Sequence, residues 1–156
     1  MRIVFNTFLA ILALVVPSIA YGPFEIQKFE YYVSQSPSRV SYSSFTFYEG
    51  VTQTSTECKY KAPRSYNVDE SSSPLPTNFT ICSNPDVKWK YQVEGQIIFV
   101  EFGYWAAPIE GTHIPEWHRI MASGTLIPTA CSPYGYSGYL CTPRETRYLT
   151  DFVIVA

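Results

Sequence analysis

The chain has little charge and almost no histidine. Only 15% of its 156 residues are charged, with 11 Lys and Arg against 13 Asp and Glu, and it contains two histidines. Its lysines and arginines form no basic cluster, so the sequence predicts no positively charged surface that would bind nucleic acid or an anionic membrane. We expect neither of these partners.

Signals for α-helix are also scarce. The chain contains 12 prolines, and no long stretch after residue 20 keeps an apolar stripe with i, i+3, i+4 spacing. After residue 20, no apolar run is long enough to cross a bilayer. The final residues, DFVIVA, are too short for an anchor signal. We therefore expect a soluble protein that is not attached to a membrane.

The one long apolar segment lies at the start of the chain. Residues 1–20 carry a single charge and then an apolar run that ends in small residues. This pattern is typical of a secretory signal peptide, and the run over residues 8–16 is much shorter than the roughly 20 residues that cross a bilayer. We expect cleavage between Ala20 and Tyr21, with residues 21–156 forming one secreted, extracellular domain.

The mature part contains four cysteines, an even number in a chain sent to an oxidising compartment, so two disulfides are expected. Three pairings are possible, and the sequence alone does not decide between them. We favour Cys58 with Cys82 and Cys131 with Cys141, because each pair is nearest in sequence and brackets a turn-rich segment. A sequon that begins at Asn78 predicts N-glycosylation of a secreted glycoprotein.

Polar and apolar residues alternate with a period of two, as in a sheet with one buried face. Residues 87–93 are the clearest case, and residues 96–104 are predicted to return as the second strand of a hairpin. The alternation continues in residues 119–128, and in residues 52–60 as a solvated or edge strand. The sequence predicts an all-β domain of about seven to ten strands, a single compact antiparallel β-barrel or β-sandwich stabilised by two disulfides.

Local patterns predict three further features of this domain. The inward face changes parity between Ile26 and Phe29, which predicts a β-bulge at residues 27–28. The closing strand is predicted at residues 148–155. Residues 61–77 are polar and contain prolines, so we expect a long surface loop there.

The sequence shows no catalytic motif. Ser137 lies in Gly-Tyr-Ser-Gly, but the second glycine comes one position early for a nucleophile elbow, which also requires a strand-to-helix turn. Glu101 is the one carboxylate in a hydrophobic setting, yet a retaining glycosidase needs a second carboxylate about 5 to 5.5 Å away. Because spacing indicates no second acid, we expect Glu101 on the solvent side of its strand. We expect no enzyme activity, no catalytic residue and no cofactor.

The two histidines, His113 and His118, lie with Glu110 and Glu116 in the segment EGTHIPEWH. An offset of five places the histidines neither on one face of a strand nor as the i, i+4 pair of a zinc-binding helix. Pro115 also opposes a regular helix. We expect a polar loop with two exposed imidazoles and no metal site.

Three tyrosines lie between two nearby cysteines in residues 129–143, TACSPYGYSGYLCTP. They are Tyr134, Tyr136 and Tyr139. In one interpretation these rings fold back and complete the core. In the other, Pro133, two glycines and a disulfide restrict the loop, so that the tyrosines contact a partner at low entropic cost. Trp117, with Trp105, would extend that contact surface.

The order of these features suggests a family. Cys58 ends an early predicted strand, Cys82 precedes a tryptophan-containing segment, and two late cysteines lie close together. This framework resembles the major-allergen family of Alternaria moulds, small secreted fungal β-barrel proteins that include plant-interacting elicitors. The similarity runs from IQKFEYY through YSSFTFYEGVTQTSTECKY and TICSNPDVKWKY to ASGTLIPTAC and the last apolar strand. The resemblance implies that the first cysteine pairs with the second and the third with the fourth.

The resemblance also implies a secreted virulence or recognition factor. The allergen has an additional cysteine near its mature N-terminus that links two subunits, and residues 21–51 of this chain contain none. A covalent dimer is therefore not expected, and a non-covalent homodimer is left open. Our first hypothesis is a non-enzymatic, allergen-like fungal effector or elicitor that binds a host extracellular protein or small molecule. The alternatives are a carbohydrate-binding module or small glycoside hydrolase, and a structural surface protein.

Overall fold

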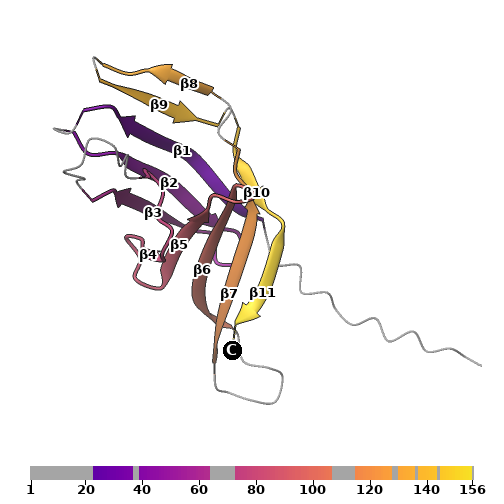
Figure 1. The fold of residues 1–156 in the computed structure, drawn as a ribbon. Helices are drawn as coiled ribbons and strands as arrows, with labels where there is room; N and C mark the ends of the chain where they lie inside the picture. The colour runs from indigo at the N-terminus through magenta and orange to yellow at the C-terminus, as the bar shows by residue number, and fades with distance from the viewer. Residues whose placement is uncertain are drawn as a thin grey trace, which may run out of the picture.

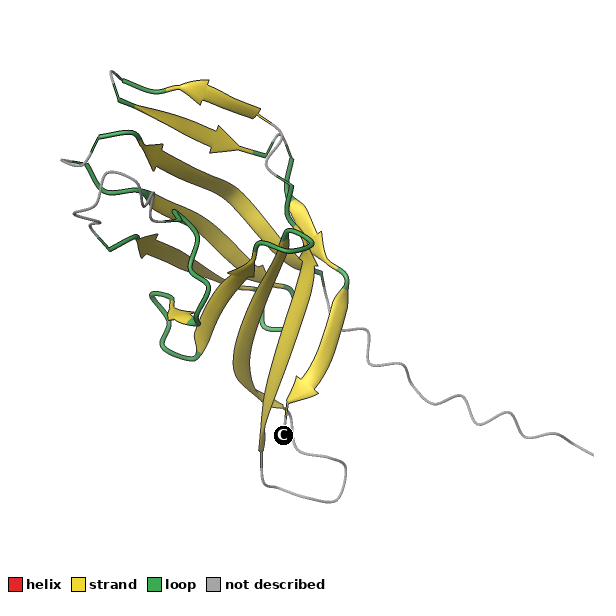
Figure 2. Cartoon of the chain, in the orientation of Figure 1, coloured by secondary structure: helices red, strands yellow, loops and turns green. Residues whose placement is uncertain are grey.

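A computed structural model describes residues 23–36, 39–63, 73–106, 115–127, 130–135, 137–143 and 145–155. The predicted signal peptide lies outside these ranges. The described residues form strands and loops but no helix (Figures 1 and 2). These residues therefore contain no helix long and apolar enough to span a membrane. Within these ranges the eleven strands are β1 (Phe24–Ser34), β2 (Tyr42–Glu49), β3 (Thr54–Lys61), β4 (Thr80–Ile81), β5 (Val87–Gln92), β6 (Ile97–Ala106), β7 (Glu116–Thr125), β8 (Ala130–Pro133), β9 (Gly138–Thr142), β10 (Arg147–Leu149) and β11 (Asp151–Val155).

The strands form two antiparallel sheets that pack against each other (Figure 1). In the first sheet the order is β3-β2-β1-β9-β8, with β10 beside the first part of β1. In the second sheet the order is β11-β7-β6-β5-β4. The predicted all-β fold is confirmed, and of the two predicted architectures the sandwich fits this arrangement.

The C-terminal segment crosses from one sheet to the other. We predicted one strand over residues 148–155, but β10 pairs with β1 in the first sheet and β11 pairs with β7 in the second. Thr150 separates the two strands, and its N–H donates to the Ser123 carbonyl at 3.1 Å. The prediction of a single closing strand is wrong, because the chain changes sheets at Thr150. This division also takes the number of strands above the predicted range.

Alternate residues of each sheet point inward and build the core. In β5, Val87, Trp89 and Tyr91 are buried, while the lysines between them are partly exposed. The ring of Trp89 meets Phe45 of the opposite sheet edge-on, with 4.8 Å between ring centroids. The alternation predicted for the strands now labelled β5 and β7 is confirmed, and β6 pairs antiparallel with β5 as the predicted second strand of a hairpin. Val93 is the exception, because it lies in the turn after β5 and is 63% exposed.

Strand β1 changes its inward face at a bulge. Its pairing with β2 shifts register between Gln27 and Glu30, and Lys28 has a φ of 53°. Ile26 is buried before the bulge and Phe29 is buried after it. The predicted bulge is confirmed, and it allows both apolar side chains of one strand to face the same core.

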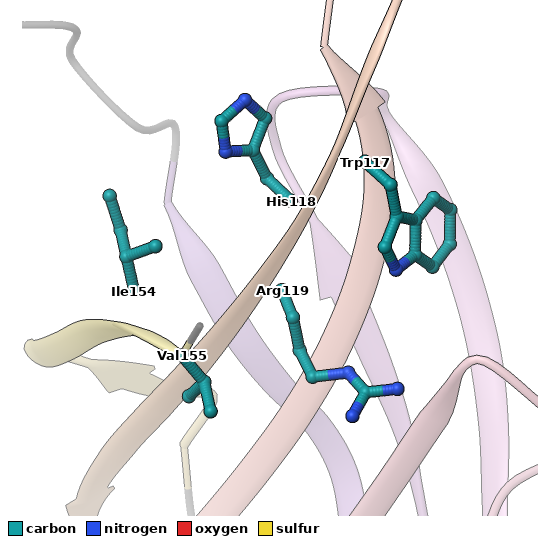
Figure 3. A pocket seen from close by; sticks show the side chains of 5 residues that line it. All are labelled: Trp117, His118, Arg119, Ile154 and Val155. Carbon is teal, nitrogen blue, oxygen red and sulfur yellow. The ribbon is translucent and has the colours of Figure 1, made fainter.

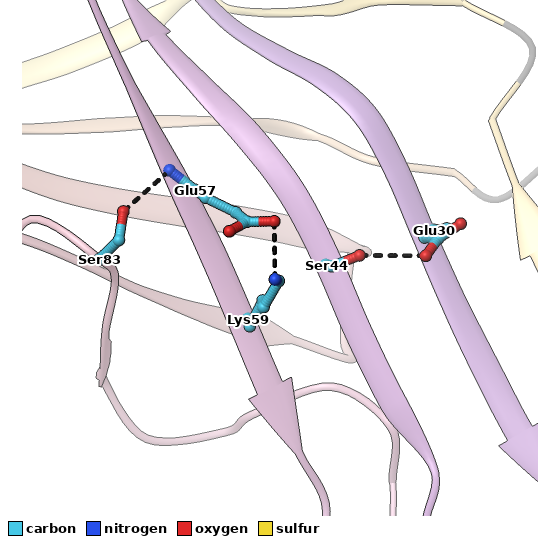
Figure 4. A network of polar contacts seen from close by, with 5 residues as sticks. All are labelled: Glu30, Ser44, Glu57, Lys59 and Ser83. Carbon is cyan, nitrogen blue, oxygen red and sulfur yellow. Dashed lines mark hydrogen bonds and ion pairs between the residues drawn. The ribbon is translucent and has the colours of Figure 1, made fainter.

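The Cys58–Cys82 disulfide joins the two sheets on the side away from the β10–β11 crossing. Cys58 lies in β3 at the edge of the first sheet, and Cys82 directly follows β4 at the edge of the second. Beside the bond, the Ser83 N–H donates to the Glu57 carbonyl at 2.8 Å, and the Glu57 N–H donates to Ser83 Oγ at 3.2 Å (Figure 4). The edge position predicted for residues 52–60 is confirmed.

The middle of the predicted surface loop lies outside the described residues, but its last part is buried. Leu75 is 9% exposed and belongs to the core, and Pro76 is buried. Ser43 Oγ donates to the Pro74 carbonyl at 2.7 Å, and the Tyr91 N–H donates to the Pro76 carbonyl at 2.7 Å. The prediction of an exposed loop is wrong here, because strand residues hold this proline-containing segment against the core.

Candidate functional site

Strands β8 and β9 form a short hairpin at one edge of the first sheet (Figure 1). Strand β9 pairs with the second half of β1, and β8 is the outermost strand. Cys131 and Cys141 lie directly opposite each other in the two strands and form a disulfide. With Cys58–Cys82, both favoured pairings are confirmed. We call the segment from Cys131 to Cys141 the tyrosine hairpin.

Two of the three predicted tyrosines lie at the surface of this hairpin. Tyr134 is 52% exposed and Tyr139 is 41% exposed. The Tyr134 N–H donates to the Gly138 carbonyl at 2.9 Å, which closes the turn between the strands. Tyr136 lies outside the described residues. The interpretation in which the tyrosines complete the core is therefore wrong for Tyr134 and Tyr139.

The tyrosine hairpin rests on Tyr32 of β1. Tyr32 is 4% exposed, although it lies on the face of β1 opposite to the core-packed Tyr31. Its ring meets Tyr134 edge-on at 6.0 Å and stacks on Tyr42 at 5.5 Å. Its hydroxyl donates to the Ser137 carbonyl at 3.3 Å. Tyr32 thus anchors the turn of the hairpin to the sandwich and leaves one side of Tyr134 open to solvent.

Gly138→Ala should loosen the hairpin. A Cβ at Gly138 would lie 2.4 Å from the ring of Tyr32, so the ring or the strand must shift. We expect a loss of about 1–3 kcal/mol in the free energy of unfolding, with faster amide hydrogen exchange concentrated in β8 and β9. Ser132→Ala, at an exposed position of β8, is the control. Unchanged exchange in the Gly138 variant would show that Tyr32 does not hold the hairpin.

Tyr31 of β1 and Tyr91 of β5 link stability to alkaline pH. Burial raises the pKa of Tyr31 above its ordinary value of 10.0, and burial followed by the proximity of Tyr31 raises the pKa of Tyr91. The folded protein therefore holds the hydroxyl protons of Tyr31 and Tyr91 more tightly than the unfolded chain does. The stability that these two tyrosines contribute is complete below pH 10.0, and it is lost as the pH rises through their folded pKa values. We expect the free energy of unfolding, measured by urea titration, to fall above that pH. Tyr91→Phe should flatten the fall, and equal slopes for the two proteins would contradict this account.

Trp117 lies on the other sheet and forms a second aromatic surface with Trp105. The two residues are cross-strand partners in β6 and β7, with ring centroids 5.2 Å apart, and are 65% exposed at Trp105 and 39% at Trp117. A Cβ at Gly103 would lie 2.1 Å from the Trp117 ring, so this ring covers the glycine backbone. The start of β7 and the tyrosine hairpin lie at opposite ends of the molecule (Figure 1). Trp117 therefore does not extend the surface of the hairpin.

A pocket of about 270 Å³ adjoins Trp117 (Figure 3). Its lining comes from the start of β7 and the end of β11: Trp117, His118, Arg119, Ile154 and Val155. His118 and Trp117 extend to opposite sides of β7, as the alternation of a strand requires (Figure 3). The pocket therefore combines an indole ring, a guanidinium group and apolar side chains at one edge of the second sheet.

Glu101 lies on the outer face of its strand, as predicted, but is only 7% exposed. Its Oε1 is 3.0 Å from Lys88 Nζ and 3.3 Å from Arg119 Nε. The two cations neutralise the carboxylate and cover it. Ser137 lies in the turn of the hairpin, where its carbonyl accepts hydrogen bonds from the Gln35 N–H and the Tyr32 hydroxyl. Its setting differs from the strand-to-helix turn of a nucleophile elbow.

The histidine segment is only partly described. His113 and Glu110 lie outside the described residues. His118 and Glu116 lie in β7, so the prediction of a loop is wrong for this pair, and His118 Nε2 is 3.6 Å from Glu116 Oε2. In the described ranges, no three His, Cys, Asp or Glu side chains come together as they would to hold a metal ion.

Comparisons with protein families, curated proteins and solved structures find no match for this chain. The resemblance to the Alternaria major-allergen family therefore stays a prediction. The candidate surfaces are the tyrosine hairpin and the tryptophan pair, and their exposure and chemistry carry the functional proposal.

Proposed function

We propose that this chain is a secreted, non-enzymatic fungal effector or elicitor, similar to the Alternaria major allergens, that binds a host extracellular molecule through the tyrosine hairpin. Two disulfides are compatible with an extracellular protein. The predicted signal peptide and the exposed sequon residue Asn78 agree with secretion and with glycosylation. The observation that carries the proposal is the exposure of Tyr134 and Tyr139 on a cross-linked hairpin.

The hairpin is suited to binding because it is already ordered. A partner that orders a flexible loop loses affinity to the entropy of that ordering. Here the Cys131–Cys141 bond, the β9–β1 pairing and the support from Tyr32 restrict the segment beforehand. Tyrosine adds a large contact area with few rotatable bonds, which is why it is frequent in binding loops and in interface hot spots.

The shape of the hairpin favours a macromolecular partner. The β8–β9 hairpin forms one outer edge of the first sheet and extends away from the second sheet (Figure 1). A protruding segment with half-exposed rings inserts into a concave surface of a partner, whereas a small molecule requires a concave site on this chain. We therefore propose a host extracellular protein as the partner.

The test compares capture of proteins from host extracellular fluid by immobilised variants. Tyr134→Ala with Tyr139→Ala should reduce the captured partner at least about tenfold, as expected when two interface tyrosines are removed. Tyr148→Ala is the matched control, because Tyr148 is 59% exposed on β10, outside the hairpin. Capture of the same partner by the folded double variant would remove the hairpin from the proposal.

A second candidate function is glycan binding by the tryptophan pair. Trp105 and Trp117 meet at an interplanar angle of 63°, and Trp117 also borders the pocket that contains Arg119. Exposed indole rings stack on sugar rings, and a guanidinium donates hydrogen bonds to hydroxyl or carboxylate groups. Affinity electrophoresis in soluble cell-wall polysaccharides should then show retardation that Trp105→Ala abolishes and the double tyrosine variant retains. Release of reducing sugar that Glu101→Gln abolishes would instead indicate a glycoside hydrolase.

A further inference from the structure

The C-terminal strand β11 is an apolar strand at the edge of a sheet. It is the last strand of the second sheet, and among the described residues it pairs only with β7. Phe152, Val153 and Ile154 are 48%, 60% and 57% exposed. The sequence DFVIV contains no lysine and no proline, two residues that commonly protect an edge from pairing with another chain, and its one charge, Asp151, lies at the start of the strand.

The pairing with β7 shows which way these side chains point. Phe152 and Ile154 lie opposite Ala122 and Ile120, which are buried on the core side of the sheet. Phe152 reaches the core ring of Phe24 edge-on at 6.2 Å, but about half of its surface stays accessible. The core side of the second sheet therefore continues as an accessible apolar strip along β11.

We propose that β11 pairs with β11 of a second copy of this chain, antiparallel, about a two-fold axis at Val153. In this register Val153 faces its own symmetry mate, and Phe152 of each copy faces Ile154 of the other. A closed two-fold contact of this kind uses the same surface in both subunits. The second sheets of the two subunits become one continuous sheet, joined by main-chain hydrogen bonds.

The side chains of β11 favour this register over its neighbours. Aromatic and β-branched residues opposite each other stabilise an antiparallel pair, and the register makes two such pairs between Phe152 and Ile154. It also places Asp151 opposite Val155 of the other copy. A shift that brought Asp151 opposite its own mate would set like charges against each other and would be unfavourable.

Cysteine cross-linking at the proposed axis gives the sharpest test. Val153→Cys should form a disulfide-linked dimer under mild oxidation of the folded protein, because directly opposed residues have Cα atoms about 4.5–5.5 Å apart. Val93→Cys is the matched control, since Val93 is 63% exposed in the turn after β5. The expected result is a dimer on a non-reducing gel for the Val153 variant and a monomer for the Val93 variant.

Light scattering after size-exclusion chromatography tests the non-covalent dimer. The unmodified protein should have the mass of a dimer, Val153→Lys should have the mass of a monomer, and Val93→Lys should remain a dimer. Circular dichroism checks that each variant is folded; if the lysine variant is not, the cysteine cross-link decides. A monomeric unmodified protein, or a Val153→Cys variant that does not cross-link, would overturn the proposal. It is independent of partner binding, because the tyrosine hairpin lies on the other sheet.

Discussion

Replacing Cys58 and Cys82 together by alanine should lower the free energy of unfolding by about 4 kcal/mol. The bond closes a loop with a sequence separation of 24, for which the chain-entropy model gives about 3.5 kcal/mol. Cys58 is 0% exposed and Cys82 is 8% exposed, so the variant also loses contacts in the core. A small domain is stable by only about 5–15 kcal/mol, so this loss is a large share of the total.

The hairpin disulfide provides the comparison for this prediction. Cys131–Cys141 has a sequence separation of 10, for which the same model gives about 3 kcal/mol, and Cys131 is exposed. Urea unfolding of both double-alanine variants should therefore show the larger loss for Cys58 and Cys82. An equal or smaller loss at that bond would contradict its role in holding the two sheets together.

Trp89→Ala should destabilise the protein by about 4 kcal/mol, the range seen when a large buried aromatic side chain is removed. Trp89 is 0% exposed and lies between the sheets, where its ring packs edge-on against Phe45. Its removal leaves a cavity between the two sheets. The Cys58–Cys82 disulfide joins these sheets, so they cannot easily move to close the cavity. The variant should lose most of its near-ultraviolet circular dichroism at temperatures where the unmodified protein is folded.

Two further variants identify the cause of that loss. Within the described residues Trp89 Nε1 has no hydrogen-bond acceptor, so Trp89→Phe loses no such bond and should lose only about 1–2 kcal/mol through its smaller volume. Trp105→Ala also replaces a tryptophan by alanine, but at a side chain that is 65% exposed. It should alter the free energy of unfolding by about 0.5 kcal/mol or less. Similar losses for Trp89→Ala and Trp105→Ala would contradict the assignment of Trp89 to the core.

Much of the fold could be predicted from the sequence where a local pattern has one physical solution. The alternation through Val87, Trp89 and Tyr91 requires a strand with one buried face, and the structure buries all three. The change of parity after Ile26 requires an extra residue in β1, which the bulge supplies. The two disulfides were favoured because each pair of cysteines is nearest in sequence and brackets a turn-rich segment, and both are present.

Features that depend on contacts distant in sequence could not be predicted. The break at Thr150 depends on where the two sheets lie relative to each other, which the sequence of residues 148–155 does not show. Tyr32 follows Tyr31 in an unremarkable strand, and its burial arises because the hairpin turn, 105 residues later at Ser137, covers it. Glu101 is covered by cations from the two neighbouring strands, and only the strand register brings them together.

The tryptophan surface was recognised only in part. Trp105 and Trp117 were expected to join the tyrosine loop, because sequence distance does not show which sheet or which end a residue occupies. A signal for their pairing was nevertheless present: Trp105 directly follows the predicted strand at residues 96–104, and Trp117 comes just before the predicted strand at residues 119–128. Consecutive strands that pair antiparallel place such residues opposite each other. The Trp117 ring covers the backbone of Gly103 because of the same strand pairing. This contact could not be predicted without the register of β6 and β7.

Residue-resolved nitration of the native protein tests the central claim, that the cross-linked hairpin presents its tyrosines to a partner. Tetranitromethane followed by peptide mass spectrometry measures the reaction rate of each tyrosine. Tyr134 and Tyr139, at 52% and 41% exposure, should react much faster than Tyr32 and Tyr91, at 4% and 5%. Protection of Tyr134 and Tyr139 to the same degree as Tyr91 would contradict the claim, because rings shielded by the protein itself cannot form a contact surface.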